Sequence, residues 1–167
     1  MSDLPDRPGR VRGSTRKVGV IGWPIEHTLS PVIHNAAFVA LGMDWVYVPL
    51  PVATARLPAA LDGLGALGFA GANVTMPHKT RSAELVPDLS HDARLLRAVN
   101  TIVVGTDGLA GHNTDALGFE RFLREDTGFD PSGRAGLLFG AGGGARACAL
   151  GLARGGLAKL SVAVREP

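Results

Sequence analysis

Short apolar runs alternate with helix-forming segments over the first half of the chain, and this alternation constrains the fold more than any other feature. Three runs have the composition of strands, and they cover 17–22, 45–50 and 70–74. The two intervening segments are predicted helices over 31–41 and 55–67, and a glycine that can end a helix follows each of them. Ser30 is the predicted N-cap of the first helix, ahead of Pro31. Strands that alternate with helices favour a largely parallel sheet.

The middle of the chain is more irregular. Short helices are predicted over 80–85 and 91–97, a hairpin over 99–104 and 108–111, and a further helix over 114–124. Residues 126–134 are rich in Asp, Gly, Pro and Ser and have the composition of a linker.

Near its end the chain carries a glycine-rich turn between an apolar strand and a helix. The strand is predicted over 136–139, the turn reads Gly140-Ala141-Gly142-Gly143-Gly144-Ala145, and the helix runs to about Arg154 before a second strand at 160–164. Glycines permit a tight turn and the close approach of a diphosphate, whose charge a helix N-terminus can meet. This pattern predicts the first strand-helix-strand unit of a Rossmann domain. Because a mononucleotide-binding half needs three strands, we expect a fragment or a truncated relative.

The fold class expected is therefore α/β, with a mixed, largely parallel N-terminal sheet and flanking helices followed by this strand-helix-strand unit. The predicted division of the chain has four parts: a disordered tail over 1–16, a first domain over 17–113, a connecting helix and linker over 114–134, and an incomplete Rossmann domain over 135–167.

Composition narrows the class of protein. An apolar fraction of 46% with 19% charged residues is typical of a globular protein that can build a core. No apolar run approaches the ~18 residues of a membrane span. The polar N-terminus has no apolar signal core, so we expect a cytoplasmic protein with no membrane partner. Cys148 is the single cysteine, which excludes an intrachain disulfide.

The net charge of +2 is unevenly distributed. Residues 1–17 carry five positive and two negative side chains, which leaves the rest of the chain at −1. A nucleic-acid-binding domain would need a basic surplus. We therefore expect no nucleic-acid partner.

Three stretches place small polar side chains at the ends of apolar runs. They are 71–79 (Gly-Ala-Asn-Val-Thr-Met-Pro-His-Lys), 98–101 (Ala-Val-Asn-Thr) and 111–115 (Gly-His-Asn-Thr-Asp). Substrates of α/β proteins bind at strand ends, so Lys79, just past a proline-broken turn, is placed to reach a ligand. Together the three stretches could surround a polyhydroxylated ligand.

These stretches, together with 24–31 (Pro-Ile-Glu-His-Thr-Leu-Ser-Pro), resemble shikimate dehydrogenase in both order and spacing. The resemblance covers about residues 17–165. It implies the reversible, NADPH-dependent reduction of 3-dehydroshikimate to shikimate, a step toward chorismate and the aromatic amino acids.

The resemblance also implies roles for single residues. Lys79 matches the family's catalytic lysine and Asp115 the aspartate that pairs with it. Thr28 and Ser30 match the two hydroxyls that bind the substrate carboxylate, although the family has serine at the first position.

Two further positions, Thr75 and Asn100, match residues that bind the ring hydroxyls of the substrate. The threonine at the first carboxylate-binding position leaves quinate open as an alternative substrate to shikimate.

The predicted cofactor is NADP. Its expected binding residues are those of the glycine-rich turn and two arginines: Gly140, Ala141, Gly142, Gly143, Gly144, Ala145, Arg146 and Arg165. Arg165 favours the 2′-phosphate of NADP, while the neighbouring Glu166 leaves NAD as the alternative. The five histidines show no metal-ligand spacing, so no metal site is predicted.

Two alternatives remain open. A non-catalytic module would bind a shikimate-like ligand or a partner chain without holding NADPH productively. A folate-linked two-domain dehydrogenase is the other, but the motifs at 24–31 and 73–79 argue against it. The missing third strand further predicts self-association through the incomplete second domain.

Overall fold

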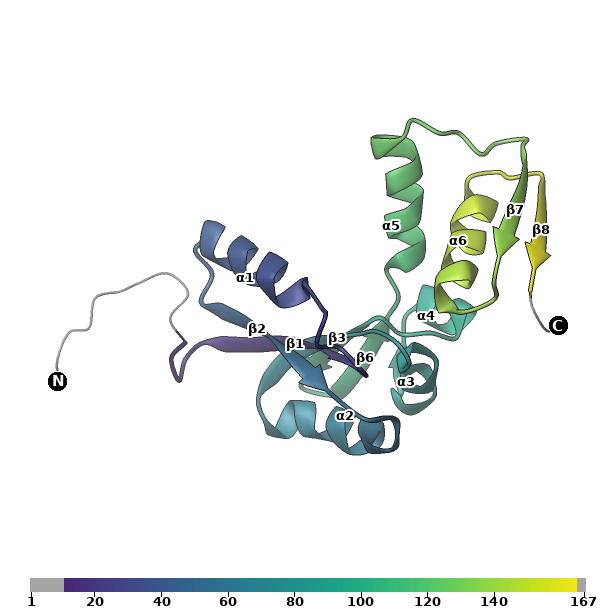
Figure 1. The fold of residues 1–167 in the computed structure, drawn as a ribbon. Helices are drawn as coiled ribbons and strands as arrows, with labels where there is room; N and C mark the ends of the chain where they lie inside the picture. The colour runs from purple at the N-terminus through teal and green to yellow at the C-terminus, as the bar shows by residue number, and fades with distance from the viewer. Residues whose placement is uncertain (1–10, 165–167) are drawn as a thin grey trace, which may run out of the picture.

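A computed structural model describes residues 11–164 and shows an α/β protein with two separate sheets joined by a helical segment (Figure 1). The strands of the larger sheet are β1 (Arg16–Gly22), β2 (Trp45–Pro51), β3 (Phe69–Val74), β4 (Asp88–Leu89), β5 (Thr101–Gly105) and β6 (Gly108–His112). The smaller sheet consists of β7 (Ala135–Phe139) and β8 (Lys159–Ala163).

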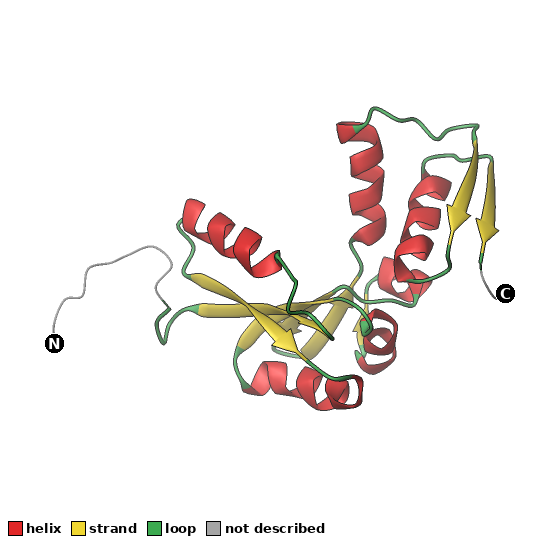
Figure 2. Cartoon of the chain, in the orientation of Figure 1, coloured by secondary structure: helices red, strands yellow, loops and turns green. Residues whose placement is uncertain are grey.

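Helices flank both sheets (Figure 2). They are α1 (Ser30–Ala40), α2 (Leu57–Ala66), α3 (Lys79–Leu85), α4 (His91–Leu96), α5 (Asp115–Arg121) and α6 (Gly143–Arg154). A 3₁₀ turn, η1 (Thr54–Arg56), leads into α2, and a π-type segment, η2 (Phe122–Asp126), continues α5.

The larger sheet is mixed, with strand order β2-β1-β3-β5-β6-β4. Its first three strands run parallel, because β1 pairs in parallel with both β2 and β3. The hairpin β5–β6 adds antiparallel to β3, and β4 pairs in parallel with β6. The predicted fold class, a mixed and largely parallel sheet followed by a strand-helix-strand unit, is confirmed.

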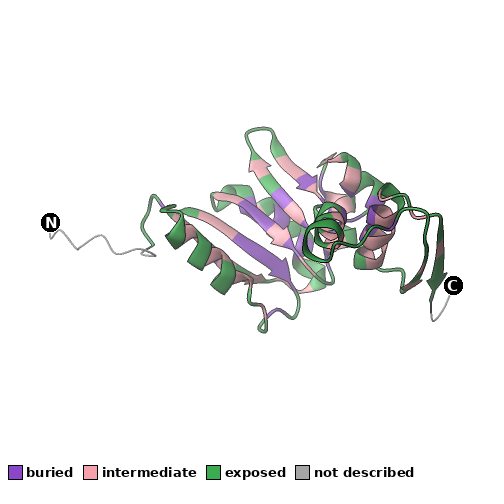
Figure 3. Cartoon of the chain, turned by 90° about the horizontal axis from the view of Figure 1, so that it is seen from above, coloured by how far each residue is buried: buried purple, intermediate pink, exposed green. Residues whose placement is uncertain are grey.

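Helices α1 and α2 cover opposite faces of this sheet (Figure 1). The main core lies on the α2 side, where Leu57, Leu61 and Leu64 form one helical stripe against buried strand residues such as Ile21 and Ile102. Burying each such aliphatic side chain contributes roughly 1.5–3 kcal/mol. The central strands are accordingly the most buried part of the chain (Figure 3). The carboxyl ends of β1 and β3 are thus anchored in the core through Ile21 and Val74.

The N-terminal segment corrects one expectation. Residues 1–10 lie outside the described structure, but the end of the predicted disordered tail is part of the fold. Arg16 opens β1, and Thr15 is buried with its hydroxyl 2.7 Å from Oδ1 of Asp44. Ser14 donates to the other oxygen of the same carboxylate. The sequence pattern missed this because Asp44 lies 29 residues further along the chain.

Three local details also differ from expectation. Ser30 is the first residue of α1 rather than its N-cap, which is Leu29 and makes no side-chain cap bond. Strand β4 was not predicted, since two residues are too few to leave a pattern. The helix predicted over 114–124 changes to π geometry after Arg121. There the hydroxyl of Thr127 donates a 2.6 Å hydrogen bond to the carbonyl of Leu123. A side-chain bond of this kind competes with the backbone bonds that would continue the α-helix.

The second unit consists of β7, α6 and β8, with the two strands parallel. Helix α6 packs against α5. The outer face of the small sheet is left open, and the side chains of Leu137 and Phe139 are 61% and 77% exposed. Within residues 11–164, none of the helices combines the length and the apolar character that crossing a bilayer requires.

Candidate active site

The carboxyl ends of β1 and β3 meet at one edge of the large sheet, and most of the predicted site residues lie there. The backbone amide of Thr75 donates to the carbonyl of Ile21, which joins the two strand ends. Gly22 permits this close approach, because a Cβ at that position would lie 2.5 Å from the methyl carbon of Thr75. Only glycine fits there without displacing the threonine.

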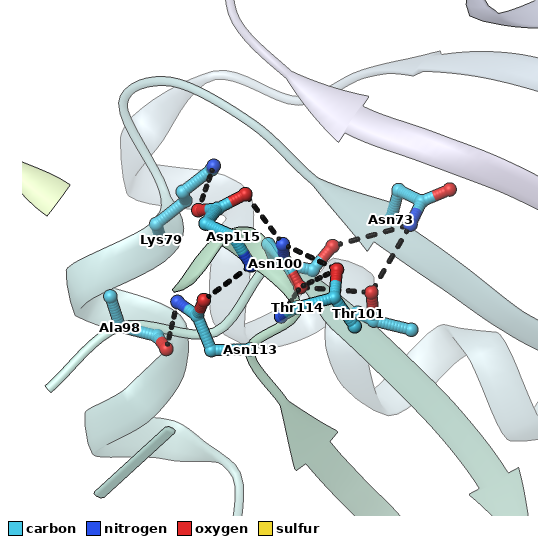
Figure 4. A network of polar contacts seen from close by, with 8 residues as sticks. All are labelled: Asn73, Lys79, Ala98, Asn100, Thr101, Asn113, Thr114 and Asp115. Atoms are coloured by element: carbon cyan, nitrogen blue, oxygen red, sulfur yellow. Dashed lines mark hydrogen bonds and ion pairs between the residues drawn. The ribbon is translucent and has the colours of Figure 1, made fainter. Parts of the chain in front are cut away.

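Lys79 and Asp115 form an ion pair at this edge (Figure 4). The ammonium nitrogen of Lys79 lies 2.8 Å from Oδ2 of Asp115, and each side chain is about a quarter exposed. Each residue opens a helix, Lys79 in α3 and Asp115 in α5. Partial burial keeps the pair ordered and still open to a ligand. The two groups that sequence reasoning assigned to catalysis are therefore in contact.

Asn100 holds the second oxygen of this carboxylate. Its amide nitrogen donates to Oδ1 of Asp115 at 2.8 Å and to the hydroxyl of Thr114 at 3.0 Å. Its amide oxygen accepts from the backbone of Thr114 and the hydroxyl of Thr101. Asn100 is 8% exposed, and these bonds fix the orientation of Asp115.

Asn113 positions the start of α5. Its side chain donates to the carbonyl of Ala98 and accepts from the backbone amide of Asp115, both at 2.9 Å. The buried amide thereby ties the loop before β5 to the helix that carries Asp115. Sequence reasoning placed Asn113 in the motif at 111–115 and assigned it no part in catalysis or substrate binding.

Asn73 is the second residue that sequence reasoning missed. Its amide oxygen accepts a 2.7 Å hydrogen bond from the hydroxyl of Tyr47, and its amide nitrogen faces Thr101 and the carbonyl of Asn100. An asparagine inside the apolar run of β3 was a usable signal, since a polar side chain there needs buried partners.

Tyr47 is buried and has an altered pKa. Burial raises its pKa to about 12, against the opposing effect of a hydrogen bond from the Ser30 hydroxyl. The phenol therefore stays protonated and acts as a hydrogen-bond donor throughout the neutral range.

The predicted carboxylate-binding hydroxyls lie in the loop between β1 and α1. Thr28 accepts a 3.3 Å hydrogen bond from the backbone amide of Ser30, so the two residues are locally linked. Both are partly exposed, as is Thr75 at the end of β3. Their access to solvent is what a ligand-binding role requires.

The glycine-rich turn approaches the ion pair from the second unit. Gly140 adopts φ +100°, a conformation that favours glycine, and its amide donates to the carbonyl of Ala163. A Cβ on Gly143 would lie 4.0 Å from Cδ of Lys79, so α6 begins beside the lysine stem. The first amides of a helix have no partner within it. The exposed turn and these amides fit a dinucleotide diphosphate.

Of the two arginines predicted to bind the cofactor, only Arg146 lies within the described residues. Arg146 lies in the first turn of α6 and donates to the hydroxyl of Thr80 at 3.2 Å, which links α6 to α3. Arg165 lies outside the described residues. Its assignment to the 2′-phosphate stays a prediction.

Cys148 lies on α6 and is partly buried. Burial raises the pKa of its thiol, and the nearby Asp115 carboxylate raises it further. The thiol therefore remains protonated at neutral pH. No group of three His, Cys, Asp or Glu side chains within residues 11–164 is arranged to hold a metal ion.

Comparison with known proteins relates this geometry to one family. The family model for the shikimate dehydrogenase substrate binding domain matches residues 20–102. A shikimate dehydrogenase (NADP(+)) from Rubrobacter xylanophilus is 53% identical over 159 residues, which cover 95% of this chain and 56% of that protein. The corresponding protein of Geobacter metallireducens is 50% identical over 156 residues, covering 93% of this chain and 54% of its own length.

Solved structures agree with the sequence relatives. A shikimate dehydrogenase crystallised with NADP+ superposes with a TM-score of 0.88 at 37% identity, covering 97% of this chain and 55% of that chain. A second from Listeria monocytogenes, in complex with shikimate and NAD, gives 0.87 at 37% identity and covers 99% of this chain and 56% of that chain. The chain thus spans a little over half the length of the relatives it matches.

Proposed function

Because this chain belongs to the shikimate dehydrogenase family, we propose that it provides the substrate-binding domain and the first cofactor-binding unit for reversible reduction of 3-dehydroshikimate to shikimate. The observation that carries the proposal is the Lys79–Asp115 ion pair beside the start of α6. It combines a proton donor, its orienting carboxylate and a turn shaped for a dinucleotide in one place.

In this reaction a bound NADPH supplies hydride to the ketone carbon. The chain's own contribution is at the carbonyl oxygen, where the developing alkoxide needs a proton and a positive charge. The ammonium of Lys79 can provide both. Asp115 holds that ammonium at 2.8 Å, and Asn100 holds Asp115. The pair is therefore arranged before substrate arrives, which reduces the reorganisation needed in the transition state.

Substrate recognition is assigned to hydroxyls and amides around the pair. Thr28 and Ser30 bind the carboxylate of the substrate, while Thr75 and Asn100 bind its ring hydroxyls. A site with buried hydrogen-bonding groups rejects analogues that leave those groups unpaired, so the arrangement can discriminate polyhydroxylated acids. Shikimate is the proposed substrate, with quinate as the alternative. NADP is the proposed cofactor, and NAD is the alternative. A cytoplasmic location belongs to the same proposal.

The test is an NADP-linked absorbance assay with shikimate and quinate side by side. The proposal is supported if the parent chain oxidises shikimate and the Lys79→Met variant does not. Absence of turnover in a chain that binds shikimate calorimetrically supports the second candidate, a non-catalytic shikimate-binding module.

We also propose self-association through the small sheet. β7 and β8 pair only with each other among the described residues, and the outer face of β7 exposes Leu137 and Phe139. An open strand edge beside an exposed apolar face invites pairing with another chain. Sedimentation velocity at two concentrations should show a dimer that Phe139→Lys dissociates. Leu67→Lys, at an exposed apolar position of the first domain, should leave it intact. A concentration-independent monomer contradicts the proposal.

A further inference from the structure

A continuous series of hydrogen bonds connects Tyr47 on β2 with the Lys79–Asp115 pair. The hydroxyl of Tyr47 donates to Oδ1 of Asn73 at 2.7 Å. On the far side, the amide nitrogen of Asn73 lies 3.3 Å from the hydroxyl of Thr101. That hydroxyl donates to Asn100, which holds Asp115. Tyr47 and the Lys79–Asp115 pair thus belong to one hydrogen-bond network.

The direction of these bonds follows from one carbonyl. The backbone oxygen of Asn100 can only accept, and it lies 3.4 Å from the side-chain nitrogen of Asn73. The amide must therefore turn its nitrogen toward that carbonyl and its oxygen toward Tyr47. A phenol hydroxyl has one proton, so Tyr47 donates that proton to Oδ1 of Asn73. Every donor in the series then points toward the Asp115 carboxylate (Figure 4 shows the part from Asn73 onward).

Tyr47 is held more firmly than its neighbours in the network. The side-chain amide of Asn35 bonds its backbone twice: Oδ1 accepts from the Tyr47 N–H at 2.8 Å, and Nδ2 donates to the Tyr47 carbonyl at 2.9 Å. The imidazole of His34 stacks on its ring, with centroids 4.2 Å apart and planes 4° from parallel. The tyrosine is 4% exposed. A side chain fixed in this way cannot follow a moving partner, so it sets the position of that partner.

Asn73 depends on this fixed hydroxyl. The Tyr47 bond is its short contact, whereas its two nitrogen contacts measure 3.3 Å and 3.4 Å. These longer bonds are the ones that a ligand hydroxyl could replace at small cost. The amide therefore has a strongly held inner end and a weakly held end that can turn to a ligand.

We propose that Tyr47 is a positioning residue of the substrate site: its hydroxyl fixes the side-chain amide of Asn73 so that the amide nitrogen is presented to a ring hydroxyl of the substrate. This inference rests on the proposed function and deepens it, since it assigns part of the ring-hydroxyl selectivity to a residue that touches no ligand. Removing the hydroxyl leaves Oδ1 of Asn73 without its donor and lets the amide turn.

The first measurement is affinity for shikimate and for analogues that each lack one ring hydroxyl, by calorimetry on the 167-residue chain. Tyr47→Phe keeps the ring and its stacking. It should weaken shikimate binding about two- to tenfold, the range for one neutral hydrogen bond. It should also reduce the penalty for the one analogue whose missing hydroxyl Asn73 would bind. Phe38→Leu, which trims the same aromatic cluster without touching the network, should leave that penalty unchanged.

A double-mutant cycle separates positioning from general loosening. In an Asn73→Ala background, Tyr47→Phe should cause no further loss of shikimate affinity. Equal losses in both backgrounds, or an equal loss for every analogue, overturn the proposal.

A second measurement needs no ligand. Proton exchange of the Asn73 side-chain amide, followed by nuclear magnetic resonance, should become faster in Tyr47→Phe and stay unchanged in Phe38→Leu. Unchanged exchange in Tyr47→Phe overturns the positioning role, whether or not shikimate binds. A parent chain that shows no affinity for shikimate defeats the proposed function instead, and the exchange result still decides what Tyr47 does to Asn73.

Discussion

Arg154, the last residue of α6, forms a bidentate ion pair with Asp92 in the first turn of α4, with nitrogen–oxygen distances of 2.8 Å and 2.5 Å. Its guanidinium also lies 3.5 Å from Glu120 on α5. One side chain therefore attaches the helix of the second unit to two helices outside it. Because α6 begins beside Lys79, this attachment at its other end helps to set where the glycine-rich turn lies.

The first prediction concerns this ion pair. Arg154→Met should loosen α6, so that amides in 143–154 exchange faster with deuterium while those of β1 and β3 do not change. Arg121→Met removes an exposed arginine on α5 and should have no such effect.

The loosening should also depend on pH. A hydrogen bond from Arg154 lowers the pKa of Asp92 below its ordinary value, so the fold favours the charged carboxylate. The stabilisation is present above the unfolded pKa of about 3.9 and is lost as pH falls through the folded value. The variant and the parent should therefore differ at pH 7 and converge in strong acid. A difference that persists there contradicts the assignment.

The second prediction tests the proton donor. Lys79→Met keeps most of the side-chain volume and removes the charge, so it should lower kcat by about 10²–10⁴-fold with a smaller effect on KM. Steady-state kinetics with shikimate and NADP+ give both constants. If KM rises while kcat is unchanged, Lys79 binds substrate and takes no part in the chemistry.

The third prediction concerns the proposed carboxylate site. Ser30→Ala should weaken shikimate binding by about 1–3 kcal/mol, the range for losing a hydrogen bond to a charged group. The matched ligand is a shikimate analogue without the carboxylate, whose affinity should not change. The same loss for both ligands would mean that Ser30 shapes the loop and does not contact the carboxylate.

The fourth prediction uses the single tyrosine of the chain. Alkaline titration of phenolate absorbance should give a midpoint near the raised pKa of about 12 in the folded protein and near ~10 in denaturant. The raised pKa stabilises the fold below pH ~10, and this contribution disappears as pH rises through the folded value. Circular dichroism recorded in parallel separates titration from unfolding. A midpoint near 10 in folded protein rules out a buried, hydrogen-bonded phenol.

The fifth prediction uses the single cysteine. Burial, together with the Asp115 carboxylate, raises the pKa of the Cys148 thiol, so it should react slowly with a disulfide reagent at pH 7.5. Asp115→Asn removes the negative charge, which should lower that pKa and speed the reaction. Asp107→Asn, on the exposed hairpin turn, is the control. Equal rates for the parent and Asp115→Asn would show that Asp115 does not act on the thiol.

The sequence by itself determined the secondary structure and the identity of most candidate site residues. Strand and helix patterns are local, because apolar spacing, glycine stops and turn residues act within a few positions. The glycine-rich turn before α6 and the polar motifs at 73–79 and 113–115 were visible for the same reason. Sequence reasoning failed locally at Ser30, which opens α1 and does not cap it, and after Arg121, where the Thr127 hydroxyl bonds the carbonyl of Leu123.

Only the tertiary structure decided which of these residues meet. Lys79 and Asp115 are 36 positions apart, Tyr47 and Asn73 are 26 apart, and Asp92 and Arg154 are 62 apart. Their contacts depend on strand order and on the docking of α6, and no local pattern encodes either. The hydrogen bond that orients Asn73 exists because β1 places β2 and β3 on its two sides, which brings the Tyr47 hydroxyl within reach of an amide two strands away.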